Sequence, residues 1–253
     1  MFIKMEKLTK TQKKDCVNRL FGESCLDFDF FLMLLLSAAI IAIGLLIDSV
    51  AVIIGGMLIT PILSPILVFA MSIVVGDAKL MKRSLNVVLW SIVSVVLISL
   101  VTALLTIDKE ITNELLARAH PSLAYFLIAM LSGLAVSYAL VAPSTSEVLP
   151  GVAISVALMP PLATIGIALA FFNWEMAVGA LGLFFLNLVG IIFASIIVFS
   201  IMNFHDVKEE IEKKLRAEEK ELNKEKKEKE AGDFKKLEAT VKEAAKVIES
   251  NKK

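Results

Sequence analysis

Charged residues are almost absent from the middle of this chain. Of the 26 basic and 26 acidic residues, only five basic and seven acidic ones lie within residues 31–205. A soluble domain carries charge over its whole surface, with about a quarter of its residues charged. The chain is also 57% hydrophobic, with a mean hydropathy of +0.77. This pattern excludes an ordinary soluble globular protein and indicates a membrane protein.

Residues that serve catalysis and metal binding are also scarce. The sequence has two histidines and two cysteines, and the spacing of Cys16 and Cys25 matches no metal-binding motif. There is no HExxH, GxSxG or P-loop motif. The basic residues of the C-terminal part are matched almost one for one by acidic residues, which argues against nucleic-acid binding. We therefore expect no enzyme activity and no cofactor or metal site.

The middle of the chain consists of long apolar runs. A helix needs about 20 apolar residues to span a membrane. A polar stretch of about thirty residues precedes the first run, so we expect that run to be a spanning helix and not a signal peptide. The sequence predicts an all-α membrane bundle of about six spans. The runs are residues 31–47, 50–75, 85–107, 122–142, 148–172 and 176–202.

The basic residues predict the orientation of these spans. Six spans place both termini and the loop 76–84 on one side of the membrane. That side carries nine basic residues from 1–30 and 76–84, whereas the loop 108–120 on the other side carries two. Since basic residues accumulate in cytoplasmic loops, we predict a multi-pass protein of the cell membrane with both termini cytoplasmic. The lipid bilayer is its first expected partner.

The segment "DSVAVIIGGMLITPILSPI" (48–66) contains helix breakers within an apolar run. A proline removes a helix hydrogen bond and clashes with the preceding turn. In lipid, non-helical backbone is tolerated only where protein or water satisfies it. We predict a broken segment that faces the interior, with freed carbonyls near residues 56–60 available to a cation. The alternative is a proline kink patched by the adjacent Ser and Thr hydroxyls.

A second segment, "EVLPGVAISVALMPPLATI" (147–165), repeats this pattern 99 residues later. Asp48 aligns with Glu147 and Pro61 with Pro160, so that acid and proline are 13 residues apart in both copies. Each copy lies between two other apolar runs. An odd number of spans per repeat makes the second repeat insert upside down. We therefore predict two inverted three-span repeats, at about 31–107 and 122–202.

These segments supply the candidate binding residues. We expect Pro160 and Pro161 to break the second copy as the first is broken. Acidic residues in membrane segments often mark ion paths, but an acid at a helix start also caps the helix, so both roles stay open for Asp48 and Glu147. The candidate substrate- or ion-binding residues are Asp48, Gly55, Gly56, Thr60, Pro61, Ser64, Pro65, Glu147, Ser155, Pro160, Pro161, Thr164 and Asn187.

Other polar and small residues predict helix ends and packing. Asn187 lies in mid-span and must find a hydrogen-bond partner inside the bundle, and Asn86 is its counterpart in the first repeat. Asp77 is expected to cap the turn before Lys79. Three glycines of the last run predict close helix packing: Gly179, Gly182 and Gly190.

The Lys/Glu-rich tail, residues 206–253, differs from the rest of the chain. Its second half carries a narrow apolar seam of the coiled-coil kind, formed by Phe234, Leu237, Val241, Ala244 and Ile248. One interpretation is a pair of cytoplasmic helices that pack on each other or on a second copy of the chain, forming a homo-oligomer. The other is a solvated, partly frayed charged helix.

Two blocks of this sequence resemble a known family. "DSVAVIIGGMLITPILSPILVFAMSIVVGD" (48–77) and "LPGVAISVALMPPLATIGIAL" (149–169) are similar to the signature blocks of an uncharacterised hydrophobic membrane domain family of bacteria and archaea, domain of unknown function three-eight-nine. The resemblance covers about residues 31–202. It implies a polytopic inner-membrane protein, and longer members carry an added soluble domain. The resemblance implies no agreed activity.

Two functions from different classes fit the sequence. Inverted repeats with broken helices near mid-membrane favour a secondary transporter or ion-coupled carrier of a small solute, with a channel as its nearest variant. The alternative is a membrane scaffold or sensor that acts through the tail. A rival topology makes 50–75 and 148–172 re-entrant hairpins, but it places the basic loop 76–84 outside, against the charge rule.

Overall fold

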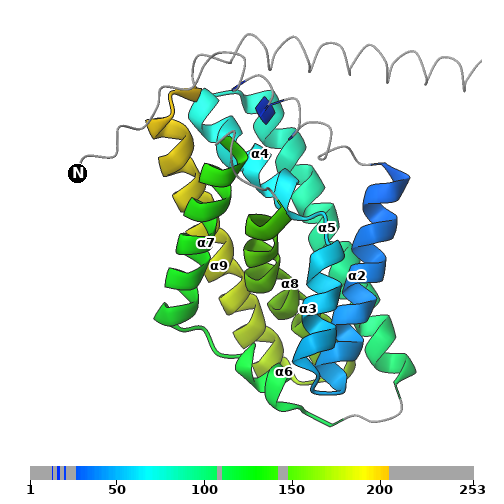
Figure 1. The fold of residues 1–253 in the computed structure, drawn as a ribbon. Helices are drawn as coiled ribbons and strands as arrows, with labels where there is room; N and C mark the ends of the chain where they lie inside the picture. The colour runs from blue at the N-terminus through cyan, green and yellow to red at the C-terminus, as the bar shows by residue number, and fades with distance from the viewer. Residues whose placement is uncertain are drawn as a thin grey trace, which may run out of the picture. The chain divides into compact units, whose positions relative to one another are not determined.

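A computed structural model of the protein describes residues 27–106, 110–141 and 148–204, together with Lys13, Cys16, Val17 and Leu20; for 148–156 it describes the backbone alone. Over these residues the chain is helical and contains no strand, which confirms the all-α prediction (Figure 1). The tail 206–253 and Glu147 lie outside the described residues. The helices are α2 (Phe28–Leu46), α3 (Val50–Ile59), α4 (Leu63–Val75), α5 (Ala78–Leu105), α6 (Asn113–Ala117), α7 (Leu123–Val141), α8 (Val148–Ala170) and α9 (Trp174–Ile201).

Several of these helices are long and apolar enough to cross a membrane. By this measure α2, α5, α7 and α9 each qualify, and α3 and α4 qualify together as one span that is bent by 58°. In α8 the part with described side chains, Ala157–Ala170, is apolar but shorter. The structure therefore has four to five candidate spans over the described residues, and the sixth span stays a prediction.

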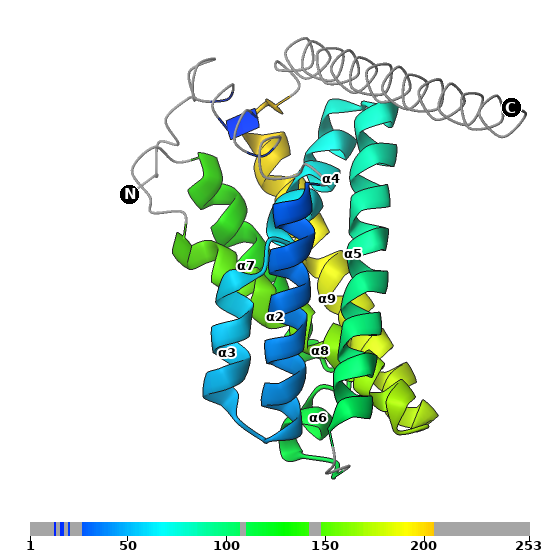
Figure 2. The ribbon, with the colours of Figure 1, turned by 90° about the vertical axis from the view of Figure 1, so that its right-hand side faces the viewer.

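The helices run alternately up and down. Figure 2 shows that α2 begins, α4 ends and α9 ends at one end of the bundle, whereas α3 begins and α6 lies at the opposite end. Near the first of these ends, the Lys13 amino group donates a hydrogen bond to the Asn203 carbonyl, just after α9, at 2.7 Å. Since α3 and α4 together pass from one end to the other, this geometry favours a broken span over a re-entrant hairpin.

The turn between α4 and α5 is set by local chemistry. Gly76 ends α4 with a φ of 71°, a left-handed conformation that suits glycine. The Asp77 carboxylate then accepts hydrogen bonds from the backbone N–H groups of Lys79 and Leu80. This confirms the predicted cap. The expected loop 76–84 is much shorter than predicted, because the capped helix α5 already begins at Ala78.

Glycines let the helices of the second half approach closely. A Cβ at Gly190 of α9 would lie 3.2 Å from the Phe126 ring of α7, and one at Gly182 would lie 3.2 Å from Pro121. A Cβ at Gly179 would meet the carbonyl of Ala119. The predicted close helix packing is confirmed for Gly190, whereas Gly179 and Gly182 pack against the segment between α6 and α7. Small residues serve this purpose in membranes because apolar side chains gain little by moving from lipid to a helix interface, so that close packing must hold the helices together.

The outer surface of the bundle is apolar. On α5, Leu89, Val93, Leu97 and Val101 recur every fourth residue, and each has about half of its side chain exposed. A water-soluble monomer rarely exposes so long an apolar stripe. The stripe therefore agrees with a protein embedded in a membrane.

Candidate functional site

The break between α3 and α4 follows from a single proline. Pro61 disfavours the helical conformation for the residue before it. Thr60 accordingly ends α3 with φ −74° and ψ 128°, which is extended backbone. Pro61 also has no N–H to offer the Met57 carbonyl, which accepts instead from the Thr60 N–H at 3.4 Å. The predicted break is confirmed.

Pro65, the second proline of this segment, does not interrupt a helix. Ser64 and Pro65 lie in the first turn of α4, where backbone N–H groups have no partner within the helix. The missing N–H of Pro65 therefore costs no helix hydrogen bond. Both residues are buried.

The neighbouring glycines have different surroundings. A Cβ at Gly56 would lie 2.6 Å from Ile41 Cγ1 of α2, whereas one at Gly55 would meet nothing within 4 Å. The close approach at Gly56 brings its carbonyl within reach of the Ser37 hydroxyl, which donates to it at 2.8 Å. This carbonyl, which the break deprives of the Thr60 N–H, is thus bonded inside the protein.

Asp48 lies at the far end of α3 from the break. It has a φ of 56° in the turn between α2 and α3. Its carboxylate accepts from the backbone N–H of Glu114 at 2.9 Å and from the Asn113 side chain at 3.1 Å. The carboxylate therefore bonds the first turn of α6, whose N-cap is Thr112, and does not cap its own helix, whose N-cap is Ser49. The ten residues of α3 place it about 15 Å from the break.

The second proline segment does not break, so the prediction for Pro160 and Pro161 is wrong. Helix α8 continues from Val148 to Ala170 with both prolines inside it. The physical reason is that a neighbouring helix supplies a replacement donor. The Ala157 carbonyl, which would bond the missing N–H of Pro161, accepts from Asn187 Nδ2 of α9 at 2.8 Å.

The remaining residues of this segment are partly described. The Thr164 hydroxyl is buried and donates to the Pro160 carbonyl at 2.9 Å, one turn earlier. Ser155 lies within α8, where only its backbone is described, and Glu147 lies outside the described residues.

Asn187 confirms the predicted bond within the bundle. It is 1% exposed, and its Oδ1 atom has no hydrogen-bond partner among the described residues. Asn86, its predicted counterpart in the first repeat, lies on an exposed face of α5. The two proposed repeats thus differ at this position and also at their prolines, since the first segment is broken and the second is continuous.

Two further buried hydroxyls of the described bundle have no hydrogen-bond partner, Thr60 Oγ1 at the break and Ser99 Oγ on α5. A buried polar group without a partner costs about 1–3 kcal/mol. The sequence does not identify Ser37 and Ser99 as functional candidates, because a single serine within an apolar run is common and indicates no particular role.

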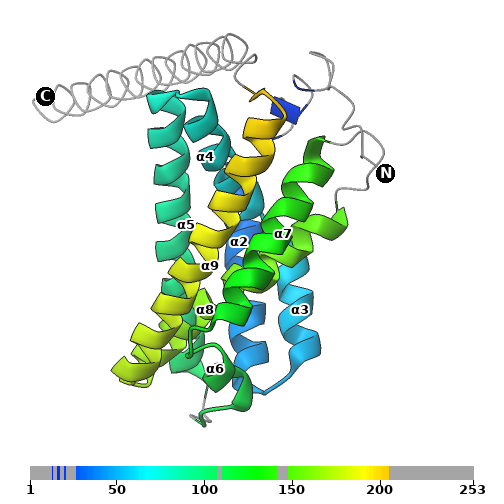
Figure 3. The same ribbon diagram turned by 90° about the vertical axis from the view of Figure 1, so that its left-hand side faces the viewer.

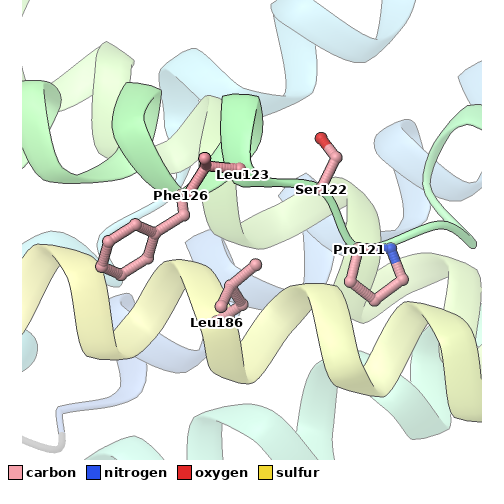
Figure 4. A pocket seen from close by; sticks show the side chains of 5 residues that line it. All are labelled: Pro121, Ser122, Leu123, Phe126 and Leu186. Atoms are coloured by element: carbon pink, nitrogen blue, oxygen red, sulfur yellow. The ribbon is translucent and has the colours of Figure 1, made fainter.

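A shallow apolar hollow of about 380 Å³ lies where α7 begins beside α9 (Figure 4). Its lining contains none of the predicted site residues: it is formed by Pro121, Ser122, Leu123, Phe126 and Leu186. Within the described part of the chain, no three His, Cys, Asp or Glu side chains gather as metal ligands would. The interior polar groups at the break and at Asn187 are therefore the main candidate site.

Comparison with known proteins places this bundle in a family. Residues 57–193 match the family described as "Domain of unknown function (DUF389)", and this region includes the break, α8 and Asn187. The chain is similar to the uncharacterized protein MJ0678 of Methanocaldococcus jannaschii, with 32% identity over 170 residues, which are 67% of this chain and 52% of the relative. It thus spans about half the length of that relative. No solved structure matches the chain. The protein belongs to the family of the domain of unknown function DUF389.

Proposed function

We propose that this protein is a secondary transporter or ion-coupled carrier of a small solute, with its binding site at the break between α3 and α4. One observation carries the proposal. In an apolar bundle the backbone leaves the helix at Thr60, and the buried Thr60 hydroxyl has no hydrogen-bond partner in the described part of the chain. Open backbone at membrane depth is tolerated where it is buried in protein or lines a cavity, and a solute would satisfy the hydroxyl.

The position of the break supports this function. Thr60 is the eleventh of the 26 residues from Val50 to Val75, so the break would lie near mid-membrane if these residues form one span. Helix α3 packs against α2 and α8, and α4 packs against α5 and α9, so protein lies beside the half-buried break, whereas Leu58 and Ile59 just before it are exposed. Transporter sites commonly lie at such discontinuous helices near the bilayer midplane.

The directions of the helices support two inverted repeats. Helices α2, α3–α4 and α5 run down, up and down, whereas α7, α8 and α9 run up, down and up (Figures 1 and 3). Two halves of opposite orientation around one site are the usual basis of alternating access. Because α8 is continuous, we assign the solute to the break in the first half, with α8 as one of the helices packed beside it.

The charge distribution supports cytoplasmic termini. Lys79, Lys82 and Arg83 lie in the first turns of α5, at the end of the bundle where α2 begins and α9 ends (Figure 2). Basic residues next to spans face the cytoplasm. We therefore propose the cell membrane as the location, with this end on its cytoplasmic side.

A flux assay tests the proposed site. Purified protein is reconstituted into liposomes, and uptake of labelled ions, amino acids and organic acids is measured for wild type and Thr60→Val. The matched control is Thr102→Val, which removes a hydroxyl that bonds its own helix at the Ile98 carbonyl, 2.8 Å away. We expect uptake of at least one solute, reduced at least tenfold in Thr60→Val and retained in the control. No uptake by wild type, or equal uptake by both variants, would contradict the proposal.

A further inference from the structure

Two adjacent prolines in α8 deprive two neighbouring carbonyls of their helix donors. In an α-helix the carbonyl of residue i accepts from the N–H of residue i+4. Pro160 and Pro161 have no N–H, so the helix offers none to the carbonyls of Val156 and Ala157. Asn187 supplies one replacement, through its Nδ2 bond of 2.8 Å to the Ala157 carbonyl.

This bond also determines where the other half of the Asn187 amide lies. Oδ1 and Nδ2 belong to one planar group and are about 2.2 Å apart, so Oδ1 lies within about 5 Å of the Ala157 carbonyl oxygen. Oδ1 is buried and has no partner within the described structure. Two acceptors, Asn187 Oδ1 and the Ala157 carbonyl oxygen, therefore lie close together in the bundle, and the Val156 carbonyl precedes the latter along α8.

We propose that Asn187 Oδ1 and the carbonyls opened by Pro160 and Pro161 bind a small monovalent cation. The role of this cation as the coupling or transported ion rests on the proposed carrier function. Its binding at this site does not. Uncharged amide and carbonyl oxygens replace the hydration shell of alkali cations in membrane proteins, often where a helix is opened. Calcium and magnesium sites use carboxylates, and the described residues contain no cluster of them.

The position of Asn187 suits an ion site in a carrier. It is the fourteenth of the 28 residues of α9, which places it near the middle of its span, as Thr60 is in α3–α4. A buried acceptor without a partner is unfavourable, and a cation would offset this cost. A bound water would also offset it, and the dependence of unfolding on the cation separates the two.

Thermal unfolding of the whole protein in detergent tests cation binding. The unfolding midpoint is measured in LiCl, NaCl and KCl against choline chloride at equal ionic strength, because choline is too large for such a site. One of the small cations should raise the midpoint saturably, by about 5–10 °C at 100 times its dissociation constant. Equal midpoints in all four salts would overturn the proposal and leave water as the occupant.

Pro160→Ala is the decisive variant, because its expected effect on cation binding does not require the protein to lose stability. It gives the Val156 carbonyl an N–H donor within α8, so the apparent cation affinity should fall at least tenfold while the midpoint in choline chloride stays the same or rises. Asn187→Leu should abolish the cation-dependent shift. The matched control is Pro121→Ala, which changes a proline outside the helices and should keep the full shift. A wild-type shift in Pro160→Ala would overturn the proposal.

The outcome separates this site from the proposed function. If a cation shifts the midpoint in wild type but not in Pro160→Ala, and no solute is taken up into liposomes, the cation site stands and the carrier function fails. If uptake is measured without any cation-dependent shift, the carrier function stands and the cation site is refuted.

Discussion

Two neighbouring glycines of α3 should respond to the same substitution in opposite directions. In Gly56→Ala the new Cβ would lie 2.6 Å from Ile41 Cγ1 and 3.1 Å from the Ile41 backbone nitrogen. Ile41 is fully buried, so neither atom can move unless α2 and α3 separate. In Gly55→Ala the Cβ meets nothing within 4 Å.

The expected magnitudes follow from these distances. Overpacking of a buried contact costs about 1–3 kcal/mol, and separation of the helices also weakens the bond from Ser37 to the Gly56 carbonyl, worth about 0.6 kcal/mol. Alanine regains about 0.5–1 kcal/mol of helix preference at either position. Gly56→Ala should therefore lower the free energy of unfolding by about 1–3 kcal/mol, and Gly55→Ala should raise it by about 0.5–1 kcal/mol.

Thermal unfolding followed by circular dichroism measures both effects. At about 2–4 °C per kcal/mol, the midpoint should fall by about 2–12 °C in Gly56→Ala and rise by about 1–4 °C in Gly55→Ala. The helix content before heating should be the same in both variants. Shifts of the same sign and size would refute the reasoning, because they would mean that Ile41 of α2 does not lie against Gly56.

Two other predictions concern the ends of the bundle. Asp48→Asn should cost less stability than Asp48→Ala, because asparagine tolerates the positive φ and keeps one acceptor for the Glu114 N–H, whereas alanine loses a cap worth about 0.5–2 kcal/mol. If Asp48→Asn abolishes uptake while the unfolding midpoint is unchanged, the carboxylate acts in transport and not as a cap. For the topology, Lys79→Cys and Asn113→Cys, each with both native cysteines replaced, should react with a membrane-impermeant maleimide from opposite sides in whole cells and inverted vesicles. Labelling from one side alone would exclude the proposed arrangement of spans.

The features that the sequence predicts correctly are those that depend on local chemistry. The ring of Pro61 disfavours helical backbone at Thr60 wherever the segment lies, so the break between α3 and α4 was predictable. The cap at Asp77 likewise involves only the two N–H groups that follow within three residues. The membrane character follows from composition alone, because an apolar run of this length has few other places to be buried.

Other outcomes required the tertiary structure, because they depend on which helix lies beside which. Pro160 and Pro161 obey the same local rules as Pro61, yet α8 continues, since Asn187 reaches the Ala157 carbonyl from α9. Gly55 and Gly56 are adjacent and identical in type, and only the position of α2 makes one of them essential for packing.

The same distinction applies to the polar residues of the candidate site. The sequence identifies Asp48 as a capping or ion-path acid, but its partner, the start of α6, is 66 residues away and was found only in the folded chain. A side chain's own chemistry decides how many hydrogen bonds it must make, and that much can be read from the sequence. Which atoms satisfy them, and which buried oxygens are left open at Thr60 and Asn187, is decided by the packing of the helices, because a hydrogen bond forms only between groups within about 3 Å of each other.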